Sequence, residues 1–180
     1  MKIILASNSA RRKELLTKYN IEYDCIPSNV EEIASPDLSV VENVKNLARI
    51  KCLDIAKKFP DRVVLGADTI VVFNNKIFGK PKDEEDALKM LLQLQGNTHE
   101  VITAVAVCKN GEIDVKYEIS RVVFKKATKE ELVEYIKTKE PMDKAGSYAI
   151  QGIGSKFIEC YEGEFDNIVG LPMKLVLKML

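Results

Sequence analysis

The sequence predicts an α/β fold built on a mixed sheet, and three patterns in it carry this prediction. Short runs rich in Val and Ile alternate along the chain with capped segments whose apolar residues recur at helical spacing. The run at residues 63–73 is apolar enough to be a strand buried on both faces. Asn110 and Gly111 join two further runs as a hairpin, which makes part of the sheet antiparallel.

The predicted elements follow one another along the chain without an internal repeat or a low-complexity segment. We expect strands at residues 2–6, 21–25, 63–73, 76–78, 101–108, 113–124 and 156–161. We expect helices at residues 11–19, after a capping box that opens at Ser39, after Asp83, after Thr128 and from Pro172. Residues 27–36 are expected to form a loop, and residues 140–154 to be irregular.

Composition and charge narrow the class of protein. The chain has 180 residues, of which 46% are hydrophobic and 30% charged, and this is typical of one soluble domain, with room for two lobes. Lys plus Arg and Asp plus Glu both number 27, so we expect neither a nucleic-acid polymer nor a membrane as partner. The four cysteines are scattered and the apolar runs are short, so a cytoplasmic, reducing location is expected.

The single histidine, His99, lies in a turn-like stretch, and we expect it to be exposed in a loop. Neither a triad pattern nor metal-ligand spacing surrounds it, so Ser-His-Asp chemistry and histidine-rich metal sites are disfavoured. Any metal would therefore be a hard cation held by oxygen ligands.

Asp68 is the one carboxylate in the middle of the apolar run at residues 63–73. An ionised carboxylate buried in a strand costs roughly several kcal/mol unless a metal, a cation or hydrogen bonds compensate it. Two interpretations stay open: a capped or salt-bridged aspartate at a strand end, or a base or metal ligand at the floor of a cleft. Gly66, two residues earlier, leaves room for a ligand or another backbone to come close.

Ser7, Ser9, Arg11 and Arg12 form a polar turn between the first predicted strand and the first predicted helix. Backbone N–H groups at a helix start, two hydroxyls and two guanidinium groups together make a local anion site. Ser9 could instead be an N-cap, with the arginines solvated. The arginines oppose the helix dipole at this end, which favours an anionic partner.

Other charged residues are ambiguous by themselves. Glu31 and Glu32 lie in a predicted loop and would simply be solvated, unless the loop folds back toward Asp68, where clustered oxygens could hold Mg²⁺ or Mn²⁺. Lys51 and Lys80 are either surface lysines or point charges on the oxygens of a polyphosphate.

The glycine-rich stretch at residues 143–154 is not a phosphate-binding P-loop. Gly152, Gly154 and Lys156 lack the four-residue spacer that precedes the lysine of that motif. Gln151 stands in an otherwise small, apolar stretch, and its amide can present a donor and an acceptor together to the edge of a nucleobase.

Six motifs in order, spread over nearly the whole chain, carry a resemblance to a known family. They are LASNSARRKELL at 5–16, LARIK at 47–51, GADTIVV at 66–72, GKP at 79–81, DKAG at 143–146 with IQG at 150–152, and VGLP at 169–172. The chain closely resembles the Maf family of nucleoside triphosphate pyrophosphatases, also called septum formation inhibitors. One departure is small: Ala10 stands where the family often has proline.

The resemblance implies a fold and an assembly. The fold would be an elongated, mixed, twisted sheet flanked by helices, similar to inosine triphosphate pyrophosphatases. A single Maf-like domain, residues 1–180, would form two lobes around a central cleft, and the protein would be a homodimer.

The resemblance also implies an activity: metal-dependent hydrolysis of dTTP and UTP to the nucleoside monophosphate and pyrophosphate, with Mg²⁺ or Mn²⁺ as cofactor. Asp68 would be the general base, and Glu32 and Asp68 would hold the metal. The expected substrate-binding residues are Ser7, Arg11, Arg12, Lys51, Thr69, Lys80 and Gln151, and Ser9 of the polar turn is added to them. The alternative function is a non-catalytic, nucleotide-sensing regulator of septum formation.

Three positions indicate the branch of the family. Arg11, Thr69 and Gln151 resemble the branch that acts on dTTP and UTP, whereas the branch that acts on 7-methyl-GTP has an aromatic residue, Gln and Glu at the matching places. The difference is physically reasonable, because a neutral amide suits a uracil or thymine ring and a carboxylate suits a cationic methylated guanine.

Overall fold

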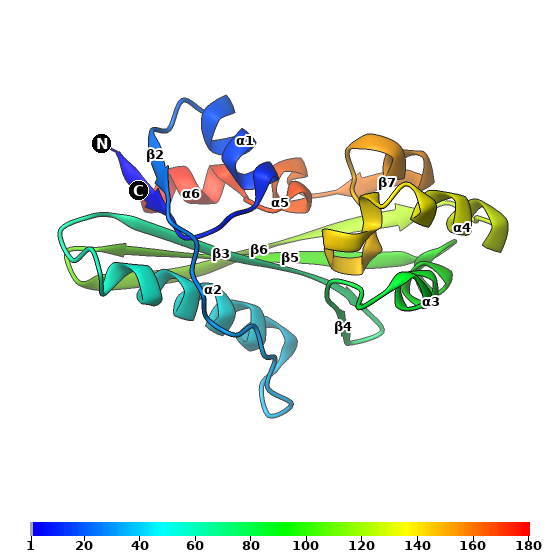
Figure 1. Cartoon of the computed structure of the whole chain (residues 1–180), viewed down its shortest axis with the longest axis horizontal. Helices are drawn as coiled ribbons and strands as arrows, with labels where there is room; N and C mark the ends of the chain where they lie inside the picture. Colours follow the sequence, from blue (N-terminus) through cyan, green and yellow to red (C-terminus); the bar gives the residue numbers. More distant parts are fainter. Residues whose placement is uncertain (1) are drawn as a thin grey trace. The chain divides into compact units, whose positions relative to one another are not determined.

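The computed structural model describes residues 2–180, which form a seven-stranded mixed sheet with helices (Figure 1). The strands are β1 (Ile3–Leu5), β2 (Tyr23–Cys25), β3 (Val64–Phe73), β4 (Lys76–Phe78), β5 (Thr98–Lys109), β6 (Glu112–Phe124) and β7 (Ile158–Glu162). The α-helices are α1 (Ala10–Lys18), α2 (Val40–Ala56), α3 (Glu84–Leu94), α4 (Lys129–Lys137), α5 (Phe165–Val169) and α6 (Met173–Met179). Three short 3₁₀ helices, η1 (Glu140–Asp143), η2 (Ala145–Ser147) and η3 (Gly152–Phe157), occupy most of the stretch expected to be irregular.

The sheet has the strand order β2-β1-β3-β5-β6-β7, and β4 pairs with β3 off this path. β1 pairs in parallel with both β2 and β3, because α1 and α2 supply the crossover connections that parallel neighbours need. β4 runs antiparallel to β3, and β7 runs antiparallel to β6. The predicted mixed α/β class is therefore confirmed.

The described residues divide into two compact units. The first consists of the residues up to Thr69 with Ile102–Glu118 and Asp166–Leu180, and the second of Ile70–Val101 with Ile119–Phe165. β3, β5 and β6 each continue from one unit into the other. The single domain expected from the family resemblance stays a prediction.

In the first unit, helices cover both faces of the parallel strands. α2 lies on one face, and α1 and α6 lie on the other (Figure 1). The capping box predicted at Ser39 is present, because its side chain accepts a hydrogen bond from the Glu42 amide and the Glu42 side chain accepts one from the Ser39 amide. Fully buried residues of this core include Ile3, Ile4, Leu5, Leu16, Val44, Ala48, Cys52, Val64 and Leu65.

At Gly66, the backbone of α2 comes close to β3. A Cβ at residue 66 would lie 2.7 Å from the carbonyl oxygen of Ala48 and 2.8 Å from the amide nitrogen of Cys52. The sequence left open whether a ligand or another backbone comes close to Gly66, and the structure shows that the backbone of α2 does.

In the second unit, α3 and α4 pack against each other. Both begin as predicted: the Asp83 side chain accepts from the Asp86 amide, and Thr128 forms a capping box with Glu131. Within residues 2–180, no helix combines the length and the apolar character that crossing a bilayer requires.

The prediction that His99 is exposed in a loop is wrong. β5 begins at Thr98, three residues before the predicted start, because amide–carbonyl bonds from Gly96 to Lys125 and from Phe124 to Asn97 continue the pairing to this point. His99 is 2% exposed, and its Nε2 lies 2.7 Å from the Tyr148 hydroxyl. Its ring meets the rings of Phe124 and Tyr148 edge-on, so the histidine is part of an aromatic core.

The close contact at Gly66 makes a stability prediction. Gly66→Ala should lower the free energy of unfolding by about 1–3 kcal/mol, since backbone atoms of α2 leave no room for the methyl group. Urea unfolding measures the loss. Gly79→Ala is the matched control: nothing lies within 4 Å of that methyl group, and a change within about 0.5 kcal/mol is expected. Equal effects of the two substitutions would contradict the close packing of α2 on β3.

The buried histidine makes the stability depend on pH. Burial lowers the pKa of His99 from 6.5 to about 4, so the unfolded chain takes up this proton at higher pH than the folded chain does. The contribution of neutral His99 is complete above the ordinary pKa and is lost as the pH falls toward the folded-state value. Between about pH 7.5 and about pH 4.5 we expect a loss of roughly 2–3 kcal/mol from this group.

Comparison of the wild type with His99→Phe isolates that contribution from the carboxylates, which titrate in both proteins. Urea unfolding at the two pH values should show a smaller loss in the variant. Parallel losses in both proteins would show that His99 does not supply the pH dependence.

Candidate active site

Asp68 and Lys51 form a buried ion pair in the first unit. Asp68 on β3 is 5% exposed and Lys51 on α2 is 8% exposed. Lys51 Nζ lies 2.6 Å from Asp68 Oδ1 and 3.0 Å from Glu32 Oε1, so two carboxylates meet on one ammonium group. Asp68 is therefore salt-bridged, but within a strand and not at its end.

Lys51 belongs to the buried face of α2. Val44, Leu47, Ala48 and Ile55 precede and follow it at helical spacing and are all buried. Because Gly66 lets α2 approach β3 so closely, the lysine amine reaches the carboxylate of Asp68. The alternative of a surface lysine is wrong for Lys51.

The acidic loop folds back toward α2, as the sequence left open. The Ser28 hydroxyl donates to Asp54 Oδ2 at 3.0 Å, and the Ser35 amide donates to Asn43 Oδ1 at 2.7 Å. These bonds attach the loop to α2 on both sides of Glu32. The Glu32 side chain remains 49% exposed, so it contacts Lys51 from the solvent side.

Arg12 is a buried guanidinium that donates hydrogen bonds to protein oxygens on three segments of the chain. Its Nε donates to the Gly170 carbonyl at 2.8 Å, and its Nη1 donates to the Ala67 carbonyl at 2.9 Å and to Ser7 Oγ at 3.2 Å. Its Nη2 donates to Thr69 Oγ1 at 3.0 Å. Burial lowers the pKa of Arg12, while the nearby charge of Asp68 opposes that change. Arg12 thus fixes the backbone and side chains on either side of Asp68.

The rest of the polar turn is less enclosed. Ser9 is the N-cap residue of α1, but its side chain makes no capping hydrogen bond, and its amide donates to Ser7 Oγ at 3.3 Å. Arg11 is half-buried on the first turn of α1. The structure therefore brings Ser7, Arg12 and Thr69 together at the stretch of β3 that carries Asp68.

Lys80 and Gln151 belong to the second unit, and both are exposed. Lys80 follows β4, and Gln151 is the N-cap residue of η3. The contacts described above for the first unit therefore do not include Lys80 or Gln151.

The oxygen ligands near Lys51 have the chemistry that a hard divalent cation requires. Within residues 2–180, no cluster of three or more His, Cys, Asp or Glu side chains could hold a metal. Glu32 and Asp68 supply two carboxylates that already converge on a cation, the Lys51 ammonium. This pair fits Mg²⁺ or Mn²⁺ if the remaining ligands are water and phosphate oxygens, the coordination that Mg²⁺ prefers.

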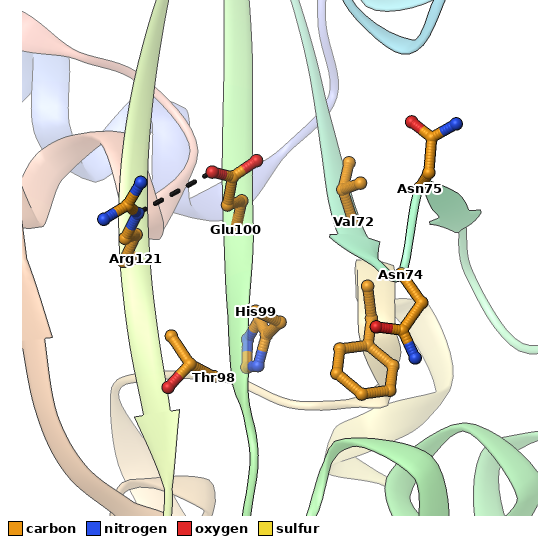
Figure 2. Close-up of a pocket in the computed structure, with 8 residues that line it drawn as sticks. Val72, Asn74, Asn75, Thr98, His99, Glu100 and Arg121 are labelled. Atoms are coloured by element: carbon orange, nitrogen blue, oxygen red, sulfur yellow. Dashed lines mark ion pairs between the residues drawn. The ribbon is translucent and has the colours of Figure 1, made fainter.

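The second unit contains a hollow of about 240 Å³ that the sequence did not indicate (Figure 2). Arg121 of β6 and Glu100 of β5 point toward each other along one side of it, with Arg121 Nε 3.7 Å from Glu100 Oε1. Asn74 and Asn75 of the turn between β3 and β4 line another side. In the sequence, Arg121 and Glu100 are isolated charged residues and Asn74 and Asn75 are turn residues. None of them belongs to a motif that would have indicated the hollow.

Thr103 and Gly170 are parts of the Asp68 neighbourhood that were not singled out from the sequence. Thr103 Oγ1 lies 2.9 Å from Thr69 Oγ1 and donates to the Asn167 carbonyl at 3.0 Å. Gly170 accepts from Arg12. Only the VGLP motif gave a signal for Gly170, and Thr103 gave none.

A solved structure with a similar fold is the Ham1 protein of Staphylococcus aureus. It matches with a TM-score of 0.51 at 18% identity, over 88% of this chain and 80% of that one. The fold is therefore a Ham1-like mixed α/β architecture, and within the first unit the Asp68–Lys51 pair lies between a central strand and α2.

The family model described as Maf-like protein matches residues 2–180, and the chain belongs to this family. A relative from Aquifex aeolicus, named dTTP/UTP pyrophosphatase, is 42% identical over 100% of this chain and 94% of its own length. Relatives of the same name from Pyrococcus furiosus and Acholeplasma laidlawii are 44% and 45% identical over 99% of this chain and 94% of theirs. The resemblance drawn from the six motifs is confirmed, and the chain is a member of an enzyme family.

The ion pair makes a prediction for stability. Lys51→Met should lower the free energy of unfolding by about 3–5 kcal/mol, because it leaves the buried Asp68 carboxylate without its cation. The double variant Lys51→Met/Asp68→Asn should lose less, since no charge is left uncompensated. Chemical denaturation measures both.

Lys89→Met is the control, because it breaks an exposed pair with Glu85 and should cost at most about 1 kcal/mol. If Lys51→Met proves no more costly than Lys89→Met, Lys51 does not compensate Asp68.

Proposed function

We propose that the chain is a nucleoside triphosphate pyrophosphatase that hydrolyses dTTP and UTP to the nucleoside monophosphate and pyrophosphate. One observation carries the proposal: a carboxylate buried within β3 is held on Lys51 Nζ, with Glu32 on the same ammonium group. The name that the full-length relatives share supports the reaction, and this cluster supports the residues that perform it.

Asp68 acts as the general base in this proposal. It accepts a proton from water, and the water oxygen forms a new bond to the α-phosphorus. The bond from the α-phosphorus to the α–β bridging oxygen breaks, and pyrophosphate leaves with that oxygen. Lys51 offsets the cost of burying the ionised carboxylate and places positive charge beside the negative charge that develops on the phosphate oxygens. Because β3 holds the backbone of Asp68 and Lys51 holds its carboxylate, the base is positioned before substrate binds.

Glu32 and Asp68 would hold the divalent cation. When bound, Mg²⁺ or Mn²⁺ would supply positive charge that polarises phosphate oxygens. The exposed position of Glu32 leaves its carboxylate accessible from solvent, whereas the protein encloses Asp68.

We assign the phosphate contacts to Ser7, Ser9, Arg11 and Arg12 of the polar turn and to Lys51. Arg12 donates to Ser7 and Thr69, so its role includes orienting these two hydroxyls. Lys80 as a further phosphate contact and Gln151 as the base contact rest on the family resemblance alone. The homodimer, the cytoplasmic location and the lack of nucleic-acid and membrane partners remain predictions from the sequence.

The activity predicts a pattern of pyrophosphate release. With Mg²⁺ or Mn²⁺, dTTP and UTP should yield pyrophosphate, 7-methyl-GTP should not, and CTP completes the panel. A chelator should stop the reaction, and excess metal should restore it. Pyrophosphate that persists with the chelator would overturn the metal requirement. No pyrophosphate from any of the four would favour the alternative, a non-catalytic nucleotide sensor that regulates septum formation.

Asp68→Asn tests the base. The variant should lower kcat by at least about 100-fold while dTTP still binds, because the amide keeps the shape of the side chain but accepts no proton. Asp61→Asn, the same change at an exposed turn, should retain wild-type turnover. Undiminished hydrolysis by Asp68→Asn would refute the assignment of the base.

A further inference from the structure

Tyr135 and Glu140 hold the backbone on both sides of Gln151. The Ala149 amide donates to the Tyr135 hydroxyl at 3.3 Å, and the Tyr135 hydroxyl donates to Glu140 Oε2 at 2.6 Å. The Gly154 amide donates to the same Glu140 Oε2 at 2.8 Å. We call these two side chains the Tyr135–Glu140 clamp.

The Glu140 carboxylate has both oxygens in use. Oε1 accepts from the Ile153 amide at 3.0 Å, while Oε2 accepts from Tyr135 and Gly154. Burial acts to raise the pKa of Glu140, but the hydrogen bonds from Tyr135, Gly154 and Ile153 outweigh it and leave the pKa below its ordinary value. The carboxylate is thus ionised at neutral pH and accepts three charge-assisted hydrogen bonds.

Two glycines of this segment leave room for the side chains of the clamp. A Cβ on Gly152 would lie 2.3 Å from Glu140 Oε1, and Gly152 has a positive φ of 77°. A Cβ on Gly154 would lie 2.5 Å from the Tyr135 hydroxyl. Both residues must therefore lack a side chain for the two clamp groups to reach the backbone.

Gln151 lies between these anchored residues. Ala149 and Ile153 are each two residues from it, and both donate to the clamp, while Gln151 itself is exposed. An exposed glutamine on a mobile loop would lose conformational freedom when it bound a base, and fixing its backbone beforehand reduces that cost.

We propose that the Tyr135–Glu140 clamp positions Gln151 for recognition of the pyrimidine ring. Glu140 and Tyr135 are positioning residues here, since they act through the backbone of residues 149–154. The inference rests on the proposed function, in which Gln151 contacts the base.

Glu140→Gln and Tyr135→Phe test the clamp in the full chain. The first replaces one acceptor oxygen with an NH₂ group that faces a backbone N–H, and the second removes only the hydroxyl. Each should raise KM for dTTP by about tenfold and leave kcat at saturation within about twofold. Glu159→Gln and Tyr161→Phe, the same changes at exposed positions of β7, should leave both constants unchanged.

A double-mutant cycle separates positioning from general damage. If Glu140 acts through Gln151, Glu140→Gln should add nothing to the KM of Gln151→Ala. Additive effects, or a fall in kcat without a change in KM, would overturn the proposal. Tyr135→Phe decides the question by the same cycle if Glu140→Gln fails to fold, as judged by its circular dichroism.

Calorimetric binding of dTTP distinguishes failure of the clamp from failure of the proposed function. If the wild type binds dTTP but releases no pyrophosphate, the proposed enzymatic activity is refuted. The same double-mutant cycle, measured with the Kd for dTTP, would then test the clamp. A wild type that neither hydrolyses nor binds dTTP would refute both. If the wild type hydrolyses dTTP normally and the effects of Glu140→Gln and Gln151→Ala on KM are additive, only the clamp proposal is refuted.

Discussion

The contact between Asp68 and Lys51 is the constraint on which the first unit depends. A carboxylate within a buried strand needs a cation, and the 2.6 Å contact supplies one only if α2 lies very close to β3. Gly66 permits that approach, and the capping box at Ser39 begins the helix whose buried face carries Lys51. The loop attached to α2 then brings Glu32 to the same ammonium group.

β3 is held at Asp68 by a second group that acts on the residues next to it. Side chains alternate along a strand, so Asp68 and Thr69 point to opposite faces. Lys51 binds Asp68, while Arg12 binds the Ala67 carbonyl and the Thr69 hydroxyl. The proposed role of Asp68 as general base needs placement to within fractions of an ångström, and fixing its strand through both neighbours supports such placement.

The sequence predicted elements and motifs well, because strands, caps and the Asn110–Gly111 hairpin are local patterns. It failed at His99, where the burial depends on Tyr148, a residue distant in sequence. It left Lys51 ambiguous for a similar reason, since only the approach of α2 to β3 decides between a surface lysine and an ion pair. Glu140 gave no signal at all, because a carboxylate that accepts backbone amides has no characteristic spacing.

The carboxylates of Asp68 and Glu140 differ in a way that separates their proposed roles in chemistry and in positioning. Glu140 uses both oxygens to accept from protein groups, so a proton would displace a bond that orders the chain. Lys51 takes up Oδ1 of Asp68, and a base needs only one further oxygen to receive a proton. A buried ion pair is also a weak source of stability, since an apolar pair of similar volume often serves as well. The presence of this ion pair within β3 is therefore better explained by the proposed catalytic role of Asp68 than by a contribution to stability.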